Sequence, residues 1–379
     1  MDIKFIFLLV ATVVFWIITR LVKKKKGLHN FLVVLFTVFV TFVAIETVYR
    51  FFLKKNPFTI KSNKNFGAYS SHPLTGFMIA DAGNMEVAKI SLNGDTIFNT
   101  SYNLIADSGA NSIGMNHRAG FRSSTNDSSE LVFLGCSITY GEGIHDQETF
   151  AYQAGQLSNT SSQNFGFSGF GTQQAYNIYL NKYARGTDSK KRTFIYSFIP
   201  DHIMRAKCVY PWNINDPYFE VSGDSLQLKG KATDFSGYAK AHKYTRYLSL
   251  MNSFTFINDI TTSVVTAKAA KALNDADYRR VVLMLSNMQK SIAAGGNQFI
   301  VIYWDKYKWK EADDAKVLDK ARIDREMEAL KQQGVTVIKA SEIFDINNTS
   351  YFIKGDGHPT AEANKLIAER IAKQVSGKL

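Results

Sequence analysis

Ser137 follows closely after a short apolar run, at a place where a side chain could do chemistry. The run Leu131–Leu134 leads through Gly135 and Cys136 to this serine. A continuous apolar run bounded by glycine predicts a buried strand, and open α/β sheets bind ligands at the carboxyl ends of their strands. Gly135 would permit the sharp turn that exposes a serine hydroxyl. Ser137 is therefore a candidate nucleophile, and an ordinary helix N-cap is the alternative interpretation.

A second candidate pair, Asp356 and His358, lies just before a predicted final helix. Residues two positions apart in an extended loop project to the same side. The carboxylate could then hold the imidazole in one tautomer, while the other ring nitrogen accepts a proton from a serine. Alone, His358 is better interpreted as a capped-loop histidine. Together with the upstream Ser137, the pair predicts a Ser-His-Asp triad.

A glycine-rich block, Asn164–Gly171, follows the second predicted strand. Its glycines could leave backbone N–H groups free to bind an oxyanion, or could form a turn with no room for side chains. The order Gly166, Gly169, Gly171 runs opposite to the G-x-G-x-x-G spacing, so no dinucleotide site is expected. We also expect no cofactor and no metal ion, because the sequence has neither an HExxH motif nor a His or Cys cluster at ligand spacing.

Two other strand-end features could be functional or structural. Cys136 could be imagined as a nucleophile, but a thiol at a buried strand end is expected to pack in the core. The segment Tyr303-Trp304-Asp305 could line a pocket or fill the core. The only other cysteine among 379 residues is Cys208, which excludes a disulfide framework and leaves one disulfide open.

The elements that must position these residues alternate between strands and helices. Alternation of this kind predicts a parallel sheet covered on both faces, with right-handed crossovers. Residues 131–379 would form this domain, interrupted by an insertion at 207–258, and residues 56–130 would form a β-rich lead-in packed on it. The predicted strands are 131–134, 165–167, 193–199, 298–303 and 335–338, and the predicted helices are 147–157, 172–183, 275–294, 316–333 and 361–375.

Residues 1–55 predict a membrane anchor. Two uncharged runs, Phe5–Ile18 and Phe31–Ile45, flank a loop that carries five cations. Each run is shorter than the roughly 20 residues that cross a bilayer, so flanking residues must extend the two transmembrane helices to about 4–22 and 30–53. Basic loops stay cytoplasmic, which places the rest of the chain outside the cytoplasm. A signal peptide and a pair of buried helices are the alternatives.

The composition limits the expected partners. Hydrophobic residues make up 45% of the chain, which excludes a disordered protein. The formal charge of +12 does not indicate nucleic acid, because part of it lies in the basic loop and the remaining cations form no single stripe. The expected partners are the lipid bilayer, through the N-terminal hairpin, and an acylated small molecule or glycan. No nucleic-acid partner is expected, and no protein partner is indicated.

Taken in order, these motifs resemble the SGNH, or GDSL-like, serine hydrolase superfamily over residues 100–375. That superfamily has a Gly-Asp-Ser strand end, a glycine block, a Gly-x-Asn block and a C-terminal Asp-x-x-His. Three flanking features are similar to its membrane-linked bacterial members: Gly120-Phe121-Arg122, Glu148-Thr149-Phe150 and Asp356-Gly357-His358-Pro359.

The resemblance implies a role for each candidate residue. Ser137 would be the nucleophile, and its amide would be one oxyanion donor. Gly169 would be a second donor, His358 the general base and Asp356 its orienting partner. The implied fold is a flavodoxin-like three-layer α/β sandwich, preceded by the transmembrane hairpin.

Three departures from the family pattern stand in the sequence. Cys136 replaces the Asp before the serine, and the Asp-to-His spacing is one residue shorter. The Gly-x-Asn block is missing, because Pro200-Asp201-His202 follows the third strand. The donor role of that asparagine is therefore vacant or passes to His202. Loss of one oxyanion donor can cost about 2.7–4 kcal/mol of transition-state stabilisation.

The resemblance implies a carboxylic ester hydrolase at the plasma or inner membrane. It would be an extracytoplasmic serine esterase that removes ester-linked acyl groups, such as acetyl, from cell-envelope glycans. An O-acyltransferase that modifies an envelope polysaccharide is one alternative. A catalytically silent glycan-binding or envelope-assembly protein is another, which the missing asparagine block favours and the retention of Ser137, Asp356 and His358 argues against.

Overall fold

The computed structural model divides the chain into two compact units. The first contains residues 1–57 and 241–268, and the second contains residues 58–240 and 269–379. Each unit is described by itself below. The residues that the structure describes are 3–54, 58–63, 69–72, 74–79, 83–106, 120–122, 130–184, 190–232, 255–271, 273–306 and 318–377.

The first unit contains two paired apolar helices, α1 (Ile3–Leu21) and α2 (Lys26–Val48), and a π-helical turn η1 (Tyr49–Leu53) continues α2. Among the described residues, only the continuous segment Lys26–Leu53 is both long and apolar enough to cross a membrane, while Phe5–Leu21 is a shorter apolar helix. The two-helix transmembrane hairpin is thus supported for its second helix alone. The physical reason is that the uncharged stretch of α1 ends at Arg20.

A third helix, α9 (Thr255–Lys271), begins in the first unit. The Glu46 carboxylate, near the end of α2, accepts hydrogen bonds from the backbone N–H groups of Thr255 at 2.7 Å and Phe256 at 2.9 Å. The Tyr49 hydroxyl donates to Asp259 at 3.0 Å. Because first-turn N–H groups have no partner within their own helix, this carboxylate caps α9.

The second unit is built on a five-stranded sheet whose order is β13-β12-β9-β7-β8. All pairings are parallel, and nearly every residue of β7, β8 and β9 is buried. The predicted α/β fold with a parallel sheet is confirmed. The strands are β7 (Leu131–Gly135), β8 (Ser162–Gly166), β9 (Thr193–Phe198), β12 (Gln298–Tyr303) and β13 (Thr336–Lys339).

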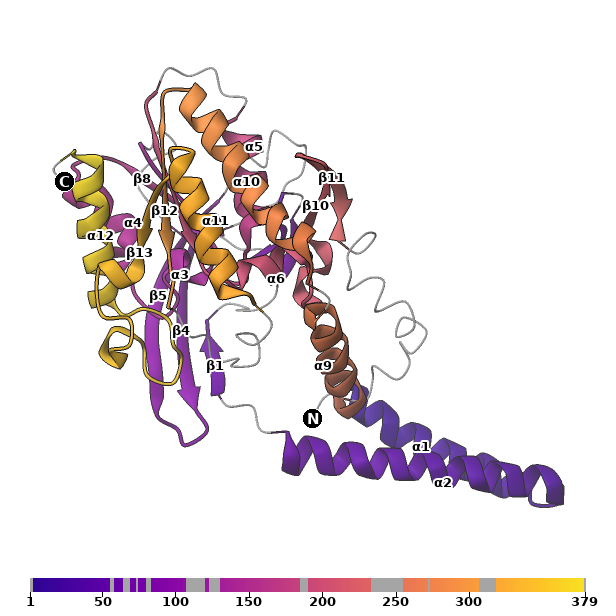
Figure 1. Cartoon of the computed structure of the whole chain (residues 1–379). Coiled ribbons are helices and arrows are strands. Elements are labelled where there is room, and N and C mark those ends of the chain that lie inside the picture. Colours follow the sequence, from indigo (N-terminus) through magenta and orange to yellow (C-terminus); the bar gives the residue numbers. More distant parts are fainter. Residues whose placement is uncertain are drawn as a thin grey trace. The chain divides into compact units, whose positions relative to one another are not determined.

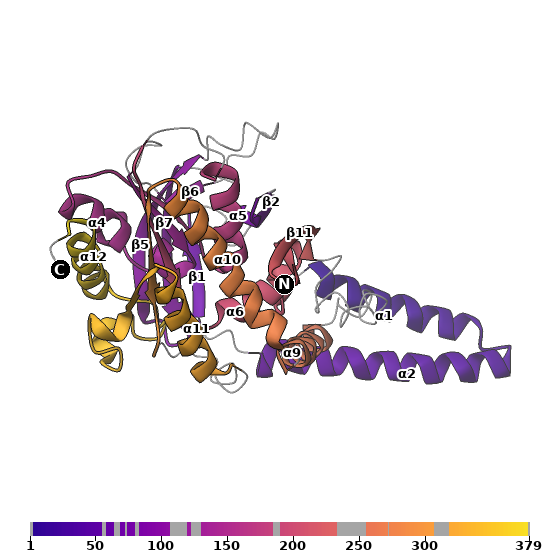
Figure 2. The same cartoon turned by 45° about the horizontal axis from the view of Figure 1, so that its top comes forward.

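Helices cover both faces of this sheet, as Figures 1 and 2 show. Successive residues of a strand point to opposite faces of the sheet, so Leu134 joins one core and Phe133 the other. The core of Leu134 contains side chains of α5 (Thr172–Lys182), α10 (Asp275–Ala294) and α11 (Lys320–Gln332). The core of Phe133 contains side chains of α4 (Phe150–Leu157) and α12 (Ala361–Val375).

The strand order creates a switch point at β7. From β7 the chain proceeds to its neighbour β8 and then crosses to β9 on the other side. In open α/β sheets ligands bind at the carboxyl ends of the strands beside such a switch. The residue that follows β7 there is Cys136, and Ser137 comes next.

The lead-in forms an antiparallel sheet of order β1-β4-β5-β6 and a separate hairpin, β2 with β3. Along β4 the side chains of Met85, Val87 and Lys89 are buried, whereas Asn84 and Glu86 are exposed. This alternation marks one packed face. The strands are β1 (Phe58–Ser62), β2 (Tyr69–His72), β3 (Gly76–Ile79), β4 (Gly83–Ser91), β5 (Thr96–Ala106) and β6 (Gly120–Arg122).

The predicted insertion is described only in part, because residues 233–254 lie outside the described residues. It follows α6 (His202–Lys207) and contains a 3₁₀ turn, η4 (Pro211–Asn215). It also contains a hairpin in which β10 (Pro217–Ser222) pairs with β11 (Ser225–Lys231).

Candidate active site

Ser137 is presented by a tight turn at the end of β7. It is the first residue of the short helix α3 (Ser137–Tyr140), and Cys136 is the preceding cap residue. Gly135 has φ +150°, and a Cβ there would lie 2.2 Å from the Thr139 hydroxyl oxygen. Only glycine fits this turn without displacing Thr139. The turn therefore fixes the serine at the carboxyl edge of the sheet.

His358 lies against Ser137 although 221 positions separate the two residues along the chain. The imidazole Nε2 is 2.8 Å from the serine Oγ, and Nδ1 is 2.5 Å from Asp356 Oδ2. His358 and Asp356 are both buried. The structure thus brings together the three residues that the sequence analysis selected, in the order hydroxyl, imidazole, carboxylate.

The loop that carries this pair is closed by its own backbone. The Ile353 N–H donates to the His358 carbonyl oxygen at 2.8 Å, and the Asp356 and Gly357 N–H groups both donate to the Ile353 carbonyl oxygen. Gly357 has φ +98°, a conformation that favours glycine. This compact turn explains how the shortened Asp-x-His spacing still aligns carboxylate and imidazole.

Lys89 of β4 is a site residue that the sequence analysis missed. Its ammonium donates a hydrogen bond to Asp356 Oδ1, and Nζ also lies 4.0 Å from the ring centroid of Phe58. Burial acts to raise the pKa of Asp356, but the hydrogen bond from His358 and the Lys89 ammonium outweigh it, so this pKa is held below its usual range. Asp356 is therefore a carboxylate at neutral pH. The signal that could have revealed it is the position of Lys89 on the buried side of a strand in which buried and exposed residues alternate.

Glu142 is a second residue that the sequence analysis missed. Its Oε2 accepts a hydrogen bond from the Ser168 hydroxyl at 2.5 Å and lies 3.8 Å from His358 Nε2. Burial acts to lower the pKa of His358, but the negative charges of Glu142 and Asp356 raise it above its ordinary value. Glu142 stands between Gly141 and Gly143, and this local pattern does not indicate a contact with an imidazole 216 positions away.

Most of the glycine block is structural. The Gly166 N–H donates to the Asn164 side chain at 2.9 Å, and the Gly171 N–H donates to the Gln174 side chain at 2.8 Å. Gly169 has φ +81°, and a Cβ there would lie 3.3 Å from the Phe77 ring. Of the three glycines selected from the sequence, Gly169 is the one whose amide remains a candidate oxyanion donor.

His202 lies in the core beneath the edge of the sheet. Its side chain is fully buried, and Nδ1 is 2.6 Å from the Tyr196 hydroxyl, which in turn is 2.8 Å from the Thr172 hydroxyl. Burial, reinforced by the nearby Arg205 charge, lowers the pKa of His202 well below its ordinary value, so the ring is neutral. No described contact links His202 to Ser137 or His358, and its role as an oxyanion donor remains a prediction.

Asp201, Cys136 and Trp304 have structural contacts. The Asp201 carboxylate accepts from Arg205 Nε at 2.5 Å and from the Tyr210 hydroxyl at 2.5 Å. Cys136 is fully buried, and desolvation raises the pKa of its thiol, so it is not an activated nucleophile. Trp304 is fully buried in the core with its Nε1 donating to Ser197 at 2.9 Å. Cys136 and Trp304 therefore fill the core, as one of the two interpretations of each predicted.

Glu142, Asp356 and His358 also form a group whose ligand atoms lie within 4.8 Å of one another, as a metal site would require. Asp356 already accepts hydrogen bonds from Lys89 and from the backbone and ring of His358. A cation would have to displace the Lys89 ammonium and compete with Ser137 for His358 Nε2. This set therefore fits a hydrogen-bonded triad better than a metal centre.

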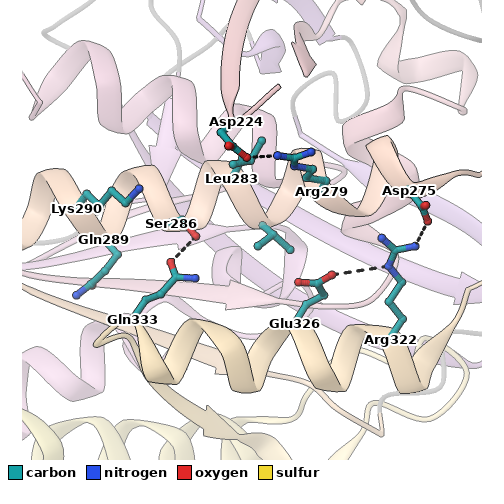
Figure 3. Close-up of a pocket in the computed structure, with 11 residues that line it drawn as sticks. Asp224, Asp275, Arg279, Leu283, Ser286, Gln289, Lys290, Arg322, Glu326 and Gln333 are labelled. Atoms are coloured by element: carbon teal, nitrogen blue, oxygen red, sulfur yellow. Dashed lines mark hydrogen bonds and ion pairs between the residues drawn. The ribbon is translucent and has the colours of Figure 1, made fainter. Parts of the chain in front are cut away.

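A separate cavity of about 790 Å³ lies along α10 and α11, and Figure 3 shows its lining. Most of its charged side chains are paired with one another: Arg279 with Asp224, and Arg322 with Asp275 and, at 3.8 Å, Glu326. None of the predicted catalytic or oxyanion residues lines it. The cavity and the Ser137 site are therefore distinct.

Comparison with known proteins gives structural neighbours only. No family model and no curated protein matches the chain. Among solved structures it is similar to a G-D-S-L family protein from Desulfitobacterium hafniense DCB-2, with 12% identity, a TM-score of 0.37, and coverage of 65% of this chain and 98% of the other. A member of the lipolytic G-D-S-L family from Veillonella parvula DSM 2008 has 12% identity and a TM-score of 0.37, covering 66% and 98%.

A protein assigned as an SGNH hydrolase, from Slackia heliotrinireducens, has 13% identity and a TM-score of 0.34, covering 65% and 97%. The structural neighbours are proteins of the SGNH superfamily. At these values the likeness carries no information about activity, so the function of this chain is inferred from the geometry of Ser137, His358 and Asp356.

Replacing Lys89 by Met should destabilise the second unit strongly, because the buried Asp356 carboxylate loses its lysine partner. We expect a loss of about 3 kcal/mol in the free energy of unfolding, measured by urea denaturation of the purified chain. Lys229→Met is the matched control, since Lys229 pairs with the exposed Glu220 at 3.1 Å and should cost less than about 1 kcal/mol. Equal losses for both variants would contradict a structural role for the buried pair.

Replacing Glu142 by Gln should lower the pKa of His358. Removing a negative charge 3.8 Å from Nε2 disfavours the imidazolium, so protonation should require lower pH. NMR titration of the His358 ring, assigned with a His358→Gln variant, measures this directly. Glu328→Gln on the exposed face of α11 is the control and should leave the titration in place. An unchanged or raised midpoint in the Glu142→Gln variant would show that the two side chains are not coupled.

Proposed function

We propose that this protein is a serine esterase that hydrolyses ester-linked acyl groups. The observation that supports this most strongly is the 2.8 Å approach of Ser137 Oγ to His358 Nε2, with Asp356 on the opposite ring nitrogen. A hydroxyl is a weak nucleophile, and a hydrogen-bonded base oriented by a third group is the arrangement that activates it. The buried thiol and the remote charged cavity offer no comparable constellation.

In the proposed reaction, Ser137 Oγ attacks the ester carbonyl carbon while His358 Nε2 takes the serine proton. Asp356 stabilises the resulting imidazolium through Nδ1, and Lys89 keeps that carboxylate ionised. The imidazolium then donates its proton to the departing alcohol, which leaves an acyl-serine. A water molecule, deprotonated by His358, attacks the acyl carbon and releases the free acid, restoring the serine.

The negative oxygen of the tetrahedral intermediate needs hydrogen-bond donors. The Ser137 amide is the first of α3, and first-turn N–H groups have no acceptor within their helix. The Gly169 amide is the second donor in this proposal. With the asparagine donor of the family absent, the transition state loses about 2.7–4 kcal/mol of stabilisation unless substrate binding offsets it. We therefore expect a slow or specialised esterase, with acyl groups on cell-envelope glycans as the substrate class.

We further propose that α2 anchors this esterase in the membrane. Many apolar side chains of the first unit are exposed, including Phe31 at 60% and Phe52 at 70%, and lipid would cover such surfaces. The basic loop before α2 favours a cytoplasmic location for itself, which puts the second unit outside the cytoplasm.

A cysteine added at the carboxyl terminus should react with a membrane-impermeant maleimide in intact cells. Reaction only after cell lysis would contradict this orientation.

A fluorophosphonate probe should label Ser137 of the detergent-solubilised chain, because the reagent traps a serine activated by a neighbouring base. Peptide mass spectrometry locates the adduct. Ser137→Ala should abolish labelling and lower esterase turnover by at least about 1,000-fold, and His358→Ala should slow both. Ser168→Ala is the matched control for a neighbouring hydroxyl and should still be labelled at Ser137. Ester hydrolysis without labelling of Ser137 would contradict the proposal. So would the absence of both ester hydrolysis and labelling.

A further inference from the structure

Trp212 is the only exposed aromatic side chain among the second-unit residues whose burial is described, and 45% of it is accessible to solvent. It lies in η4, within the insertion. Its ring stacks flat on Tyr210, with centroids 4.2 Å apart and planes inclined by 6°. An exposed tryptophan that is backed by a second ring is a rigid, open surface.

This surface adjoins the candidate active site. A Cβ at Gly169 would lie 3.5 Å from Trp212 Nε1. The preceding residue, Ser168, donates a hydrogen bond to Glu142, whose carboxylate is 3.8 Å from His358 Nε2. Trp212 therefore stands beside the same glycine turn that carries the candidate oxyanion donor.

Buried contacts hold the aromatic pair in place. The Tyr210 hydroxyl donates to Asp201 at 2.5 Å, and Arg205 donates to the other oxygen of this carboxylate. Arg205 Nη1 also donates to the Phe170 carbonyl oxygen at 2.8 Å. These contacts link the platform to the glycine turn through groups that are at most 8% exposed. They also give Asp201, which replaces the missing family block, a specific structural task.

We propose that Trp212 is the platform of a sugar-binding subsite, on which a pyranose ring of a glycan substrate stacks beside Ser137. This rests on the proposed esterase function and names its substrate class. The C–H groups on one face of a pyranose carry partial positive charge, which complements the negative face of an aromatic ring. The Glu142 carboxylate and Ser168 hydroxyl are the nearby groups that can bind sugar hydroxyls. A fatty acyl chain would instead require apolar side chains on several sides, which a ring that is 45% exposed does not offer.

Saturation-transfer NMR on the full chain carrying Ser137→Ala tests this without turnover. The probes are cellotetraose, xylotetraose and chitotetraose, with sodium octanoate as the acyl-chain probe. We expect saturation transfer to the ring C–H protons of at least one oligosaccharide. Trp212→Ala should reduce that signal at least fivefold, and Trp212→Phe should retain about half, because a smaller aromatic face remains. Leu228→Ala, which removes another exposed apolar side chain, is the matched control and should keep the full signal.

Three results would overturn the inference. The first is the absence of saturation transfer to all three oligosaccharides, and the second is an oligosaccharide signal that Trp212→Ala leaves intact. The third is loss of octanoate binding alone in Trp212→Ala, which would assign the platform to an acyl chain. Because binding is read in a variant without the nucleophile, failure here differs from failure of fluorophosphonate labelling, which would remove the esterase but leave sugar binding standing.

Discussion

The buried carboxylate of Asp356 is the group on which the candidate site depends. A carboxylate removed from water is costly unless charged and hydrogen-bonding groups surround it. Here the partners come from two distant parts of the chain: the ammonium of Lys89 and the backbone and ring of His358. The N-terminal antiparallel sheet is therefore part of the site, because its strand β4 provides the cation that keeps Asp356 ionised.

Negative charge around the imidazole has two opposite consequences. Asp356 and Glu142 both favour the imidazolium that would form during acyl transfer, which stabilises the charge developed in the reaction. The same charges raise the pKa of His358, so a larger share of the free protein is protonated and inactive at mildly acidic pH. The proposed reaction should therefore proceed better on the alkaline side. The Glu142 carboxylate also disfavours anionic acyl groups near Ser137, in agreement with a neutral acyl group such as acetyl.

Local patterns predicted the sheet, whereas the grouping of Ser137, Asp356 and His358, which spans 221 positions, was expected from strand-end placement together with the family resemblance of the motifs. Buried parallel strands are continuous apolar runs, and strand ends next to glycine indicate where side chains gather. Lys89 was missed because its role arises from a contact with Asp356, 267 positions away. Glu142 was missed because its role arises from packing against the turn that carries Ser168. The side chain of His202 is buried against Tyr196, and its role as an oxyanion donor stays a prediction. Chain order alone gives no information about which way a side chain at the edge of a sheet points.

The most direct test of the proposed chemistry is to trap the acyl-serine itself. The chain would be mixed with p-nitrophenyl acetate, quenched in acid within the first turnover, digested and analysed by mass spectrometry. The proposed mechanism predicts one acetyl group on the peptide that contains Ser137, formed at the rate of p-nitrophenol release and absent from Ser137→Ala. Release of p-nitrophenol with the acetyl group on another residue, or with no acetyl group on the Ser137 peptide at any time within the first turnover, would contradict it.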